Sequence, residues 1–222
     1  MKQFQAIIFD MDGVIVDSEP LHERAFRDVF GELGRADTHG IDFAAYCGKS
    51  DLVLWQDFVA RHRPTQSLAE LVARKDDRFT ALILEHEPIF AGLPDLLAKL
   101  APRYLLGLAS GSGHPTIRAV LGMKGLQRFF SVVVSADDVP NGKPAPDIFL
   151  RAAELLAVPP SACCVVEDSV AGVEAALAAG MEVIGITNTF PAGQLSRATH
   201  VVGAYREIER LLLAAPTGQG VE

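Results

Sequence analysis

The fold is decided at Ala6-Ile7-Ile8-Phe9-Asp10-Met11-Asp12-Gly13, where an apolar run leads into two carboxylates and a glycine. The run is rich in β-branched and aromatic side chains and predicts a buried strand. Open α/β sheets bind ligands outside the carboxyl ends of their strands, which is where Asp10 and Asp12 would stand. Two such acids can act separately as nucleophile and proton carrier, and their oxygens suit Mg²⁺. The alternative interpretation is that Asp12-Gly13 forms only a turn.

The composition indicates a globular protein with no nucleic-acid partner. The 222 residues are 49% hydrophobic and 22% charged, and the net charge is −8. This acidic balance argues against nucleic acid or an anionic membrane surface as the main partner. Cys47, Cys163 and Cys164 form no disulfide framework, and no apolar run has the form of a signal peptide or a membrane span. We therefore expect a reduced, cytoplasmic protein.

Apolar spacing changes from strand-like to helical after Asp17 and returns to alternating strands and helices from Tyr104. We expect helices and no strand over residues 18–90, with Asp17 and Ser18 capping the first helix. Strands are expected at 6–9, 104–109, 130–134, 162–166, 183–186 and 200–202, and later helices at 114–122, 146–157, 169–179 and 205–214.

Regular alternation of strands and helices predicts an α/β fold with a Rossmann-like parallel sheet and helices on both faces. The helical block interrupts this sheet directly after its first strand. We therefore expect a Rossmann-like catalytic core at residues 1–17 and 91–222. An inserted all-helical cap domain at residues 18–90 would lie over the acids.

Three later strand ends carry groups suited to phosphate or metal. Ser110-Gly111 offers a hydroxyl and backbone amides to a phosphate, although such pairs also form ordinary turns. Lys143, in a segment stiffened by two prolines, is suited to a phosphate contact or is a solvated loop lysine. Glu167 and Asp168 are adjacent carboxylates that need a nearby cation, although Asp168 or Ser169 can also cap the next helix.

In a parallel sheet all these strand ends face one crevice, so they are expected to meet Asp10 and Asp12 there. Acidic metal ligands facing a hydroxyl and a lysine, with a nucleophile between them, suit phosphoryl transfer. Positioning and charge stabilisation are most of what that reaction requires.

These motifs resemble the four motifs of the haloacid dehalogenase-like hydrolase superfamily, in order and in spacing along the whole chain. They are Asp10-Met11-Asp12-Gly13-Val14, Ser110, Gly142-Lys143-Pro144-Ala145-Pro146-Asp147 and Glu167-Asp168-Ser169-Val170-Ala171-Gly172-Val173. A helical insertion after the first motif is similar to the subgroup that holds β-phosphoglucomutase and the sugar-phosphate and phosphoglycolate phosphatases.

The resemblance implies a role for each motif residue. Asp10 would be the nucleophile that forms an aspartyl-phosphate, and Asp12 the general acid and base. Ser110, the Gly111 amide and Lys143 would hold the transferring phosphoryl group. The ligands of Mg²⁺ would be Asp10, the backbone carbonyl of Asp12, Glu167 and Asp168.

The resemblance extends less directly to the helical block. His22 and Lys75 fall where β-phosphoglucomutase has a histidine and a lysine that act on substrate; the alternatives are a partly buried helix histidine and an exposed lysine. The mutase loop reads Gly-x-Ser-Arg, and its arginine binds the distal phosphate. Here the run is Gly48-Lys49-Ser50-Asp51. Asp51 would repel a second phosphate, which counts against mutase chemistry, and Lys49 is the cation left to replace the arginine.

We therefore expect a Mg²⁺-dependent phosphatase that hydrolyses a small phosphorylated metabolite, such as a sugar phosphate, through an aspartyl-phosphate. A mutase of the β-phosphoglucomutase type is the first alternative. A phospho-accepting signalling domain is a more remote one, because receiver domains carry no helical insertion after their first strand. The expected partner is the metabolite, with no nucleic acid and no membrane, and the chain is expected to be a monomer or a weak homo-oligomer.

Overall fold

Six parallel strands form one sheet in the order β3-β2-β1-β4-β5-β6 in the computed structural model, which describes residues 4–46 and 50–213. The strands are β1 (Ala6–Phe9), β2 (Leu105–Ser110), β3 (Val132–Ser135), β4 (Cys163–Glu167), β5 (Glu182–Ile186) and β6 (His200–Val202). β1 lies between β2 and β4, and Phe9 is paired with Leu108 on one side and Val166 on the other. The next residue, Asp10, therefore emerges at the centre of the sheet's carboxyl edge, the usual ligand position in such folds.

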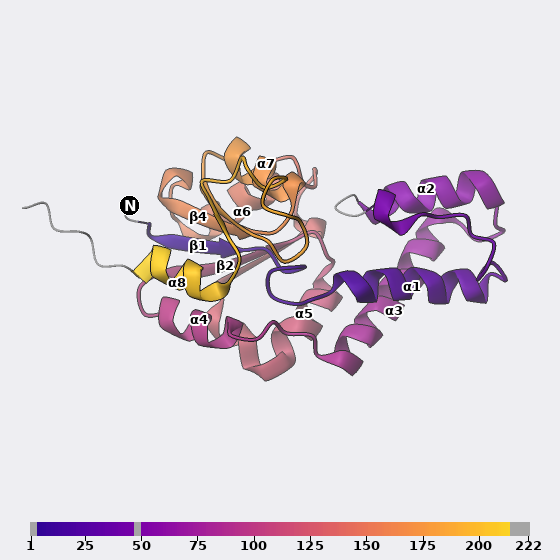
Figure 1. Cartoon of the computed structure of the whole chain (residues 1–222), viewed down its shortest axis with the longest axis horizontal. Helices are drawn as coiled ribbons and strands as arrows, with labels where there is room; N and C mark the ends of the chain where they lie inside the picture. Colours follow the sequence, from indigo (N-terminus) through magenta and orange to yellow (C-terminus); the bar gives the residue numbers. More distant parts are fainter. Residues whose placement is uncertain (1–3, 47–49, 214–222) are drawn as a thin grey trace, which may run out of the picture.

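Helices cover both faces of the sheet (Figure 1). Those on one face are α4 (Leu93–Leu100), α5 (His114–Gly122) and α8 (Tyr205–Leu213); those on the other are α6 (Asp147–Leu156) and α7 (Val170–Ala178). Phe9 belongs to the apolar cluster of the first face and Ile8 to that of the second. Burial on both sides explains why β1 is a continuous apolar run. The predicted α/β Rossmann-like class is confirmed.

The helical block stands beside the sheet and has its own aromatic core (Figure 1). Its helices are α1 (Glu19–Glu32), α2 (Asp51–His62) and α3 (Leu68–His86). Phe30 stacks on Phe58 with ring centroids 4.4 Å apart, and Trp55 meets both rings edge-on. Within the described parts of residues 18–90 there is no strand, as the apolar spacing predicts. The limits of core and cap as domains stay a prediction.

The expected capping of α1 is wrong, and one helix was not expected. Ser18 stands at the N-cap position of α1, but its backbone is close to helical (φ −96°, ψ −17°) and its hydroxyl accepts no first-turn amide. Asp17 is exposed and likewise caps nothing in the described structure. Helix α4 was not predicted, although Leu93, Leu96, Leu97 and Leu100 have helical spacing and Pro94 marks the first turn.

The other elements agree with their predicted limits to within two residues. Ser169, not Asp168, caps α7, because its Oγ accepts the Gly172 amide at 3.0 Å. Cys163 and Cys164 are buried free thiols, and Cys47 lies outside the described residues. Among the helices of the described residues, none is both long enough and apolar enough to cross a membrane.

Candidate active site

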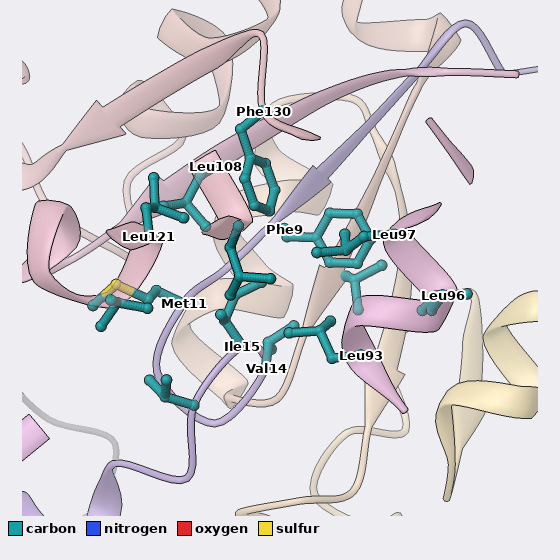
Figure 2. Close-up of a cluster of buried hydrophobic side chains, with 14 of the residues drawn as sticks. Phe9, Met11, Val14, Ile15, Leu93, Leu96, Leu97, Leu108, Leu121 and Phe130 are labelled. Carbon is teal, nitrogen blue, oxygen red and sulfur yellow. The ribbon is translucent and has the colours of Figure 1, made fainter. Parts of the chain in front are cut away.

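The first motif is anchored by the side chains around its acids. Phe9, Met11, Val14 and Ile15 are fully buried in the cluster that includes the leucines of α4 (Figure 2). The backbone is therefore fixed on both sides of Asp10. The turn that follows closes on itself, because the amide of Ile15 donates to the Met11 carbonyl at 2.7 Å. Asp10 itself is only 5% exposed.

Asp10 lies among other buried carboxylates. Asp10, Glu167 and Asp168 each offer an oxygen, and these oxygens lie within 4.8 Å of one another. Lys143 reaches the same place: its Nζ is 2.5 Å from Asp10 Oδ1 and 2.6 Å from Glu167 Oε1. Its side chain is 12% exposed, so it is not a solvated loop lysine. The strand ends thus bring together the groups that were expected to meet.

The charges of this cluster are not balanced. The pKa of Asp10 is raised to about 7, because burial, Glu167 and Asp12 raise it by more than Lys143 lowers it. Burial and the neighbouring Glu167 and Asp10 also raise the pKa of Asp168 well above its usual value. One lysine against three buried carboxylates leaves an excess of negative charge. Hard carboxylate oxygens with excess charge are the donor set that Mg²⁺ prefers, so these residues fit that ion.

Glu167 differs from the other two acids because protein donors occupy both of its oxygens. Oε1 accepts from Lys143, while Oε2 accepts from the amides of Asp168 and Ser169, both at 2.7 Å, and from the Ser169 hydroxyl at 3.0 Å. A Cβ at Gly172 would lie 1.7 Å from Glu167 Oε1, so only glycine leaves space for this carboxylate. Glu167 is therefore placed to hold Lys143 and the strand end.

Asp12 has different surroundings from Asp10. Its Oδ2 accepts the Ser112 hydroxyl at 2.9 Å and lies 3.5 Å from Ser110 Oγ. Its Oδ1 is buried, has no hydrogen-bond partner among the described residues, and lies 3.6 Å from His22 Nε2. Burial raises the pKa of Asp12, but His22 and the hydroxyls of Ser18 and Ser112 outweigh it and lower the pKa to about 2. Asp12 is thus a carboxylate with one oxygen free to take a proton.

The Ser110-Gly111 pair lies where the sequence predicts. Ser110 is fully buried at the end of β2, and its Oγ accepts the Ser112 amide at 3.0 Å. Gly111 is exposed, and a Cβ there would meet nothing within 4 Å, so space remains beside it for a ligand. Ser112 was not among the predicted site residues, although Ser112-Gly113 repeats the Ser110-Gly111 pattern immediately after it.

The helical block contributes two polar side chains, Lys75 and His22, that lead to Asp12. His22 stacks on Phe79 with centroids 3.8 Å apart, and its Nδ1 lies 2.6 Å from Lys75 Nζ. Because an ammonium group only donates, Nδ1 accepts and Nε2 carries the proton that faces Asp12. Lys75 is 1% exposed, so the expected alternative of an exposed lysine is wrong.

Asp51 does not stand free to face a second phosphate. Its carboxylate forms an ion pair with the buried Lys75. Among the described residues, the ion pairs of Lys75 are with Asp51 and Asp76 of the helical block and with none of the acids at the strand ends. Its link to Asp12 is through His22. Lys49 lies outside the described residues.

Comparison with known proteins gives consistent similarities. The family model of the haloacid dehalogenase-like hydrolases matches residues 4–180. A fructose-1-phosphate phosphatase of Escherichia coli is 32% identical over 83% of this chain and 97% of its own length.

Two solved structures illustrate the same likeness. The β-phosphoglucomutase of Clostridium difficile has a TM-score of 0.80 and 26% identity, over 95% of this chain and 96% of that one. The protein CbbY of Rhodobacter sphaeroides, solved as a mutant in complex with xylulose-1,5-bisphosphate, has a TM-score of 0.79 and 26% identity, over 92% of this chain and 96% of that one.

Proposed function

Because this chain belongs to the haloacid dehalogenase-like hydrolase family and is a phosphatase, we propose that it hydrolyses a phosphorylated carbohydrate through an aspartyl-phosphate on Asp10, with Mg²⁺ as cofactor. One observation carries the proposal. The buried Asp10 carboxylate lies beside a lysine and two further acids at the central strand end. A carboxylate in such a place is a nucleophile that splits one difficult hydrolysis into two easier steps.

In this mechanism the chain's residues have distinct tasks. Asp12 first takes up a proton from solvent on its unpaired Oδ1. Asp10 Oδ then attacks phosphorus, the P–O bond to the sugar breaks, and Asp12 gives this proton to the leaving oxygen. Asp12 then takes a proton from water as that water attacks the phosphoryl group and frees Asp10. Ser110, the Gly111 amide and Lys143 hold the phosphoryl oxygens during both steps.

Asp10, Asp168 and the Asp12 carbonyl would hold Mg²⁺, which supplies charge stabilisation to the phosphoryl group when bound. Glu167 belongs to the same group; its protein hydrogen bonds favour a role in fixing Lys143 beside the metal ligands.

We propose residues 18–90 as the cap domain and residues 1–17 and 91–222 as the core. Support comes from the separate aromatic core of the helical block and from His22, whose Nε2 lies 3.6 Å from Asp12 Oδ1. A block that brings a polar group to within this distance of the acid and base can contact the sugar portion of the substrate. The cytoplasmic location of the protein and its monomeric or weakly oligomeric state stay predictions.

The substrate class we propose is a sugar monophosphate. The relative from Escherichia coli acts, by its name, on fructose 1-phosphate, whereas CbbY was solved with a bisphosphate. In this chain the charge of Lys75 is compensated by Asp51, which leaves less positive charge in the helical block for a second phosphate.

The test is phosphate release from a panel of sugar monophosphates and bisphosphates in the presence of Mg²⁺. We expect release from monophosphates by the wild type. Asp10→Asn is expected to lose at least about three orders of magnitude in kcat, because it removes the nucleophile. Asp17→Asn, an exposed acid of the same segment, is the matched control. Substantial release by Asp10→Asn would disprove the covalent mechanism.

The same assay separates a phosphatase from a mutase. β-Glucose 1-phosphate is expected to yield free phosphate and glucose. Conversion to glucose 6-phosphate with little phosphate release would favour the mutase, to which one solved structure is similar. Membership of the hydrolase family favours an enzyme over a phospho-accepting signalling domain.

A further inference from the structure

The turn after Asp12 is held from outside by two side chains that the mechanism above does not use. Asn188 Nδ2 donates to the Gly13 carbonyl at 2.7 Å, and the Tyr205 hydroxyl donates to the Val14 carbonyl at 2.8 Å. Asn188 Nδ2 also lies 3.2 Å from the Tyr205 hydroxyl, so the two side chains support each other. Asn188 follows β5 and Tyr205 begins α8, far from the turn in the sequence.

This turn needs such support because of its glycine. Gly13 has a φ of +73°, and glycine restricts the backbone least of all residues. The turn's own bonds run from the Gly13 amide to the Val16 carbonyl and from later amides to Met11. Asn188 and Tyr205 donate to the Gly13 and Val14 carbonyls, which accept none of these bonds, and they fix the peptide planes that follow Gly13 and Val14.

Tyr205 also touches the second connection between the sheet and the helical block. Its ring packs on Phe90 with centroids 6.0 Å apart. The two connections run antiparallel to each other: Val16 bridges Ile89, and the Asp17 amide donates to the Pro88 carbonyl at 2.8 Å. One side chain of the last described helix therefore holds both segments through which the helical block joins the sheet.

We propose that Tyr205 and Asn188 are positioning residues that fix the turn at residues 12–16, and through it Asp12 and the paired connections to the helical block. The kinetic part of this inference rests on the proposed phosphatase function. Proton transfer depends on placement, and a displacement of about 1 Å can cost about 10²-fold in rate. The anchoring part rests only on the contacts described.

The chain offers a matched control for Tyr205→Phe. Tyr104 is also half-buried, and its hydroxyl donates to the Leu212 carbonyl of α8 at 2.5 Å, but it precedes β2 at the opposite edge of the sheet. Tyr104→Phe and Tyr205→Phe each remove one tyrosine–carbonyl hydrogen bond and keep the ring. Each is expected to lower Tm by about 2–4 °C, as the loss of about 1 kcal/mol predicts.

Two further measurements separate positioning from simple stabilisation. Hydrogen exchange in a peptide covering residues 11–17 is expected to be faster in Tyr205→Phe than in Tyr104→Phe or the wild type. With the substrate that the wild type uses best, kcat of Tyr205→Phe is expected to fall about tenfold with KM within about twofold, while Tyr104→Phe keeps both. Asn188→Asp, which removes the donor, is expected to act in the same direction. The double variant is expected to lose less than the sum of the two effects, because both residues hold one turn.

Unchanged exchange at residues 11–17 in Tyr205→Phe would overturn the proposal, and so would faster exchange with unchanged kcat. A failure of the proposed function has a different signature: the wild type then releases no phosphate from the panel, and the exchange comparison still decides whether the turn is anchored.

Discussion

Gly13 lies directly against Asp168, so that a Cβ built at position 13 would stand 1.8 Å from Asp168 Oδ2 and 2.8 Å from Thr189 Oγ1. Gly13 also has a positive φ of +73°. The chain therefore passes one of the buried acids at a distance that only glycine allows. This approach brings the turn after Asp12 and the end of β4 into contact.

Gly13→Ala is expected to displace Asp168 and to strain the turn, at a cost of about 1–3 kcal/mol in the free energy of unfolding. Phosphate release is expected to fall more than the loss of stability explains, because the moved carboxylate belongs to the acid cluster. Urea unfolding and kcat measure the two effects. Gly122→Ala, where φ is −65° and a Cβ meets nothing within 4 Å, is expected to leave both unchanged or to stabilise slightly. Equal behaviour of the two variants would contradict the prediction.

Mg²⁺ is expected to stabilise the protein more at pH 7.5 than at pH 5.0. The pKa of Asp10 is raised to about 7, above its ordinary value of 3.8, so the protonated folded form contributes stability below about 3.8 that is lost as the pH rises to about 7. Above that range Asp10 is charged and binds a cation without releasing its own proton. We expect Tm to rise by about 5 °C or more in excess Mg²⁺ at pH 7.5, and by less at pH 5.0.

Asp168→Asn is expected to lose most of this Mg²⁺ effect, and Asp17→Asn is expected to keep it. EDTA is expected to abolish phosphate release. Ca²⁺ is expected to raise Tm but to inhibit release, because it accepts more ligands at longer distances. A Tm independent of Mg²⁺ at both pH values, with full release in EDTA, would remove the metal from the mechanism.

Asp12→Ala is expected to lower kcat by about 10²–10⁴-fold, the usual contribution of a general acid and base. Because the pKa of Asp12 is lowered to about 2, its contribution to stability is present above about 3.8 and lost as the pH falls toward 2. Asp12→Ala is therefore expected to flatten the stability loss in that range. Ser112→Ala, which removes one hydrogen bond to Asp12 but keeps the carboxylate, is expected to lower kcat far less. A kcat for Asp12→Ala within about threefold of wild type means that another group moves the proton.

The sequence was sufficient to predict the sheet and the meeting of its strand ends. Regular alternation of strands and helices predicts a parallel sheet. Because the strands of such a sheet all end at the same edge, Asp10, Lys143 and Glu167 are placed there before any side-chain packing is known. Helix α4 could have been found from its leucine spacing. Ser18 does not cap α1 because its ψ is −17°, and no sequence pattern specifies this backbone angle.

Contacts between residues that lie far apart in the sequence could not be predicted from it, for a physical reason. The Lys75–Asp51 ion pair joins α3 to α2, and Lys75 is buried by Phe26 and Phe79, whose rings it faces at 5.2 and 4.6 Å. These contacts depend on how the three helices pack, not on local spacing. The support of Gly13 by Asn188 likewise depends on where the chain passes after β5.

The Lys75–Asp51 pair predicts how the preference for one or two phosphates can be changed. Asp51→Asn keeps the shape of the side chain but leaves the buried Lys75, next to His22, with only the more distant Asp76 at 3.9 Å as an ion-pair partner. The helical block then presents more positive charge, so kcat/KM for bisphosphorylated sugars relative to monophosphates is expected to rise about tenfold, equivalent to about 1.4 kcal/mol. The substrate panel measures this ratio directly.

Asp51→Arg places a second cation beside Lys75 and is expected to be the less stable variant, even though it restores the residue type found in the mutase loop. Because the Asp51 side chain is 37% exposed, the stability loss in either variant is expected to stay below the ~3–5 kcal/mol of a fully buried pair. Asp51→Asn combined with Lys75→Met removes both charges and is expected to lose the gain for bisphosphates. If the double variant keeps that gain, the preference arises from the shape of the substrate loop and not from the compensation of Lys75.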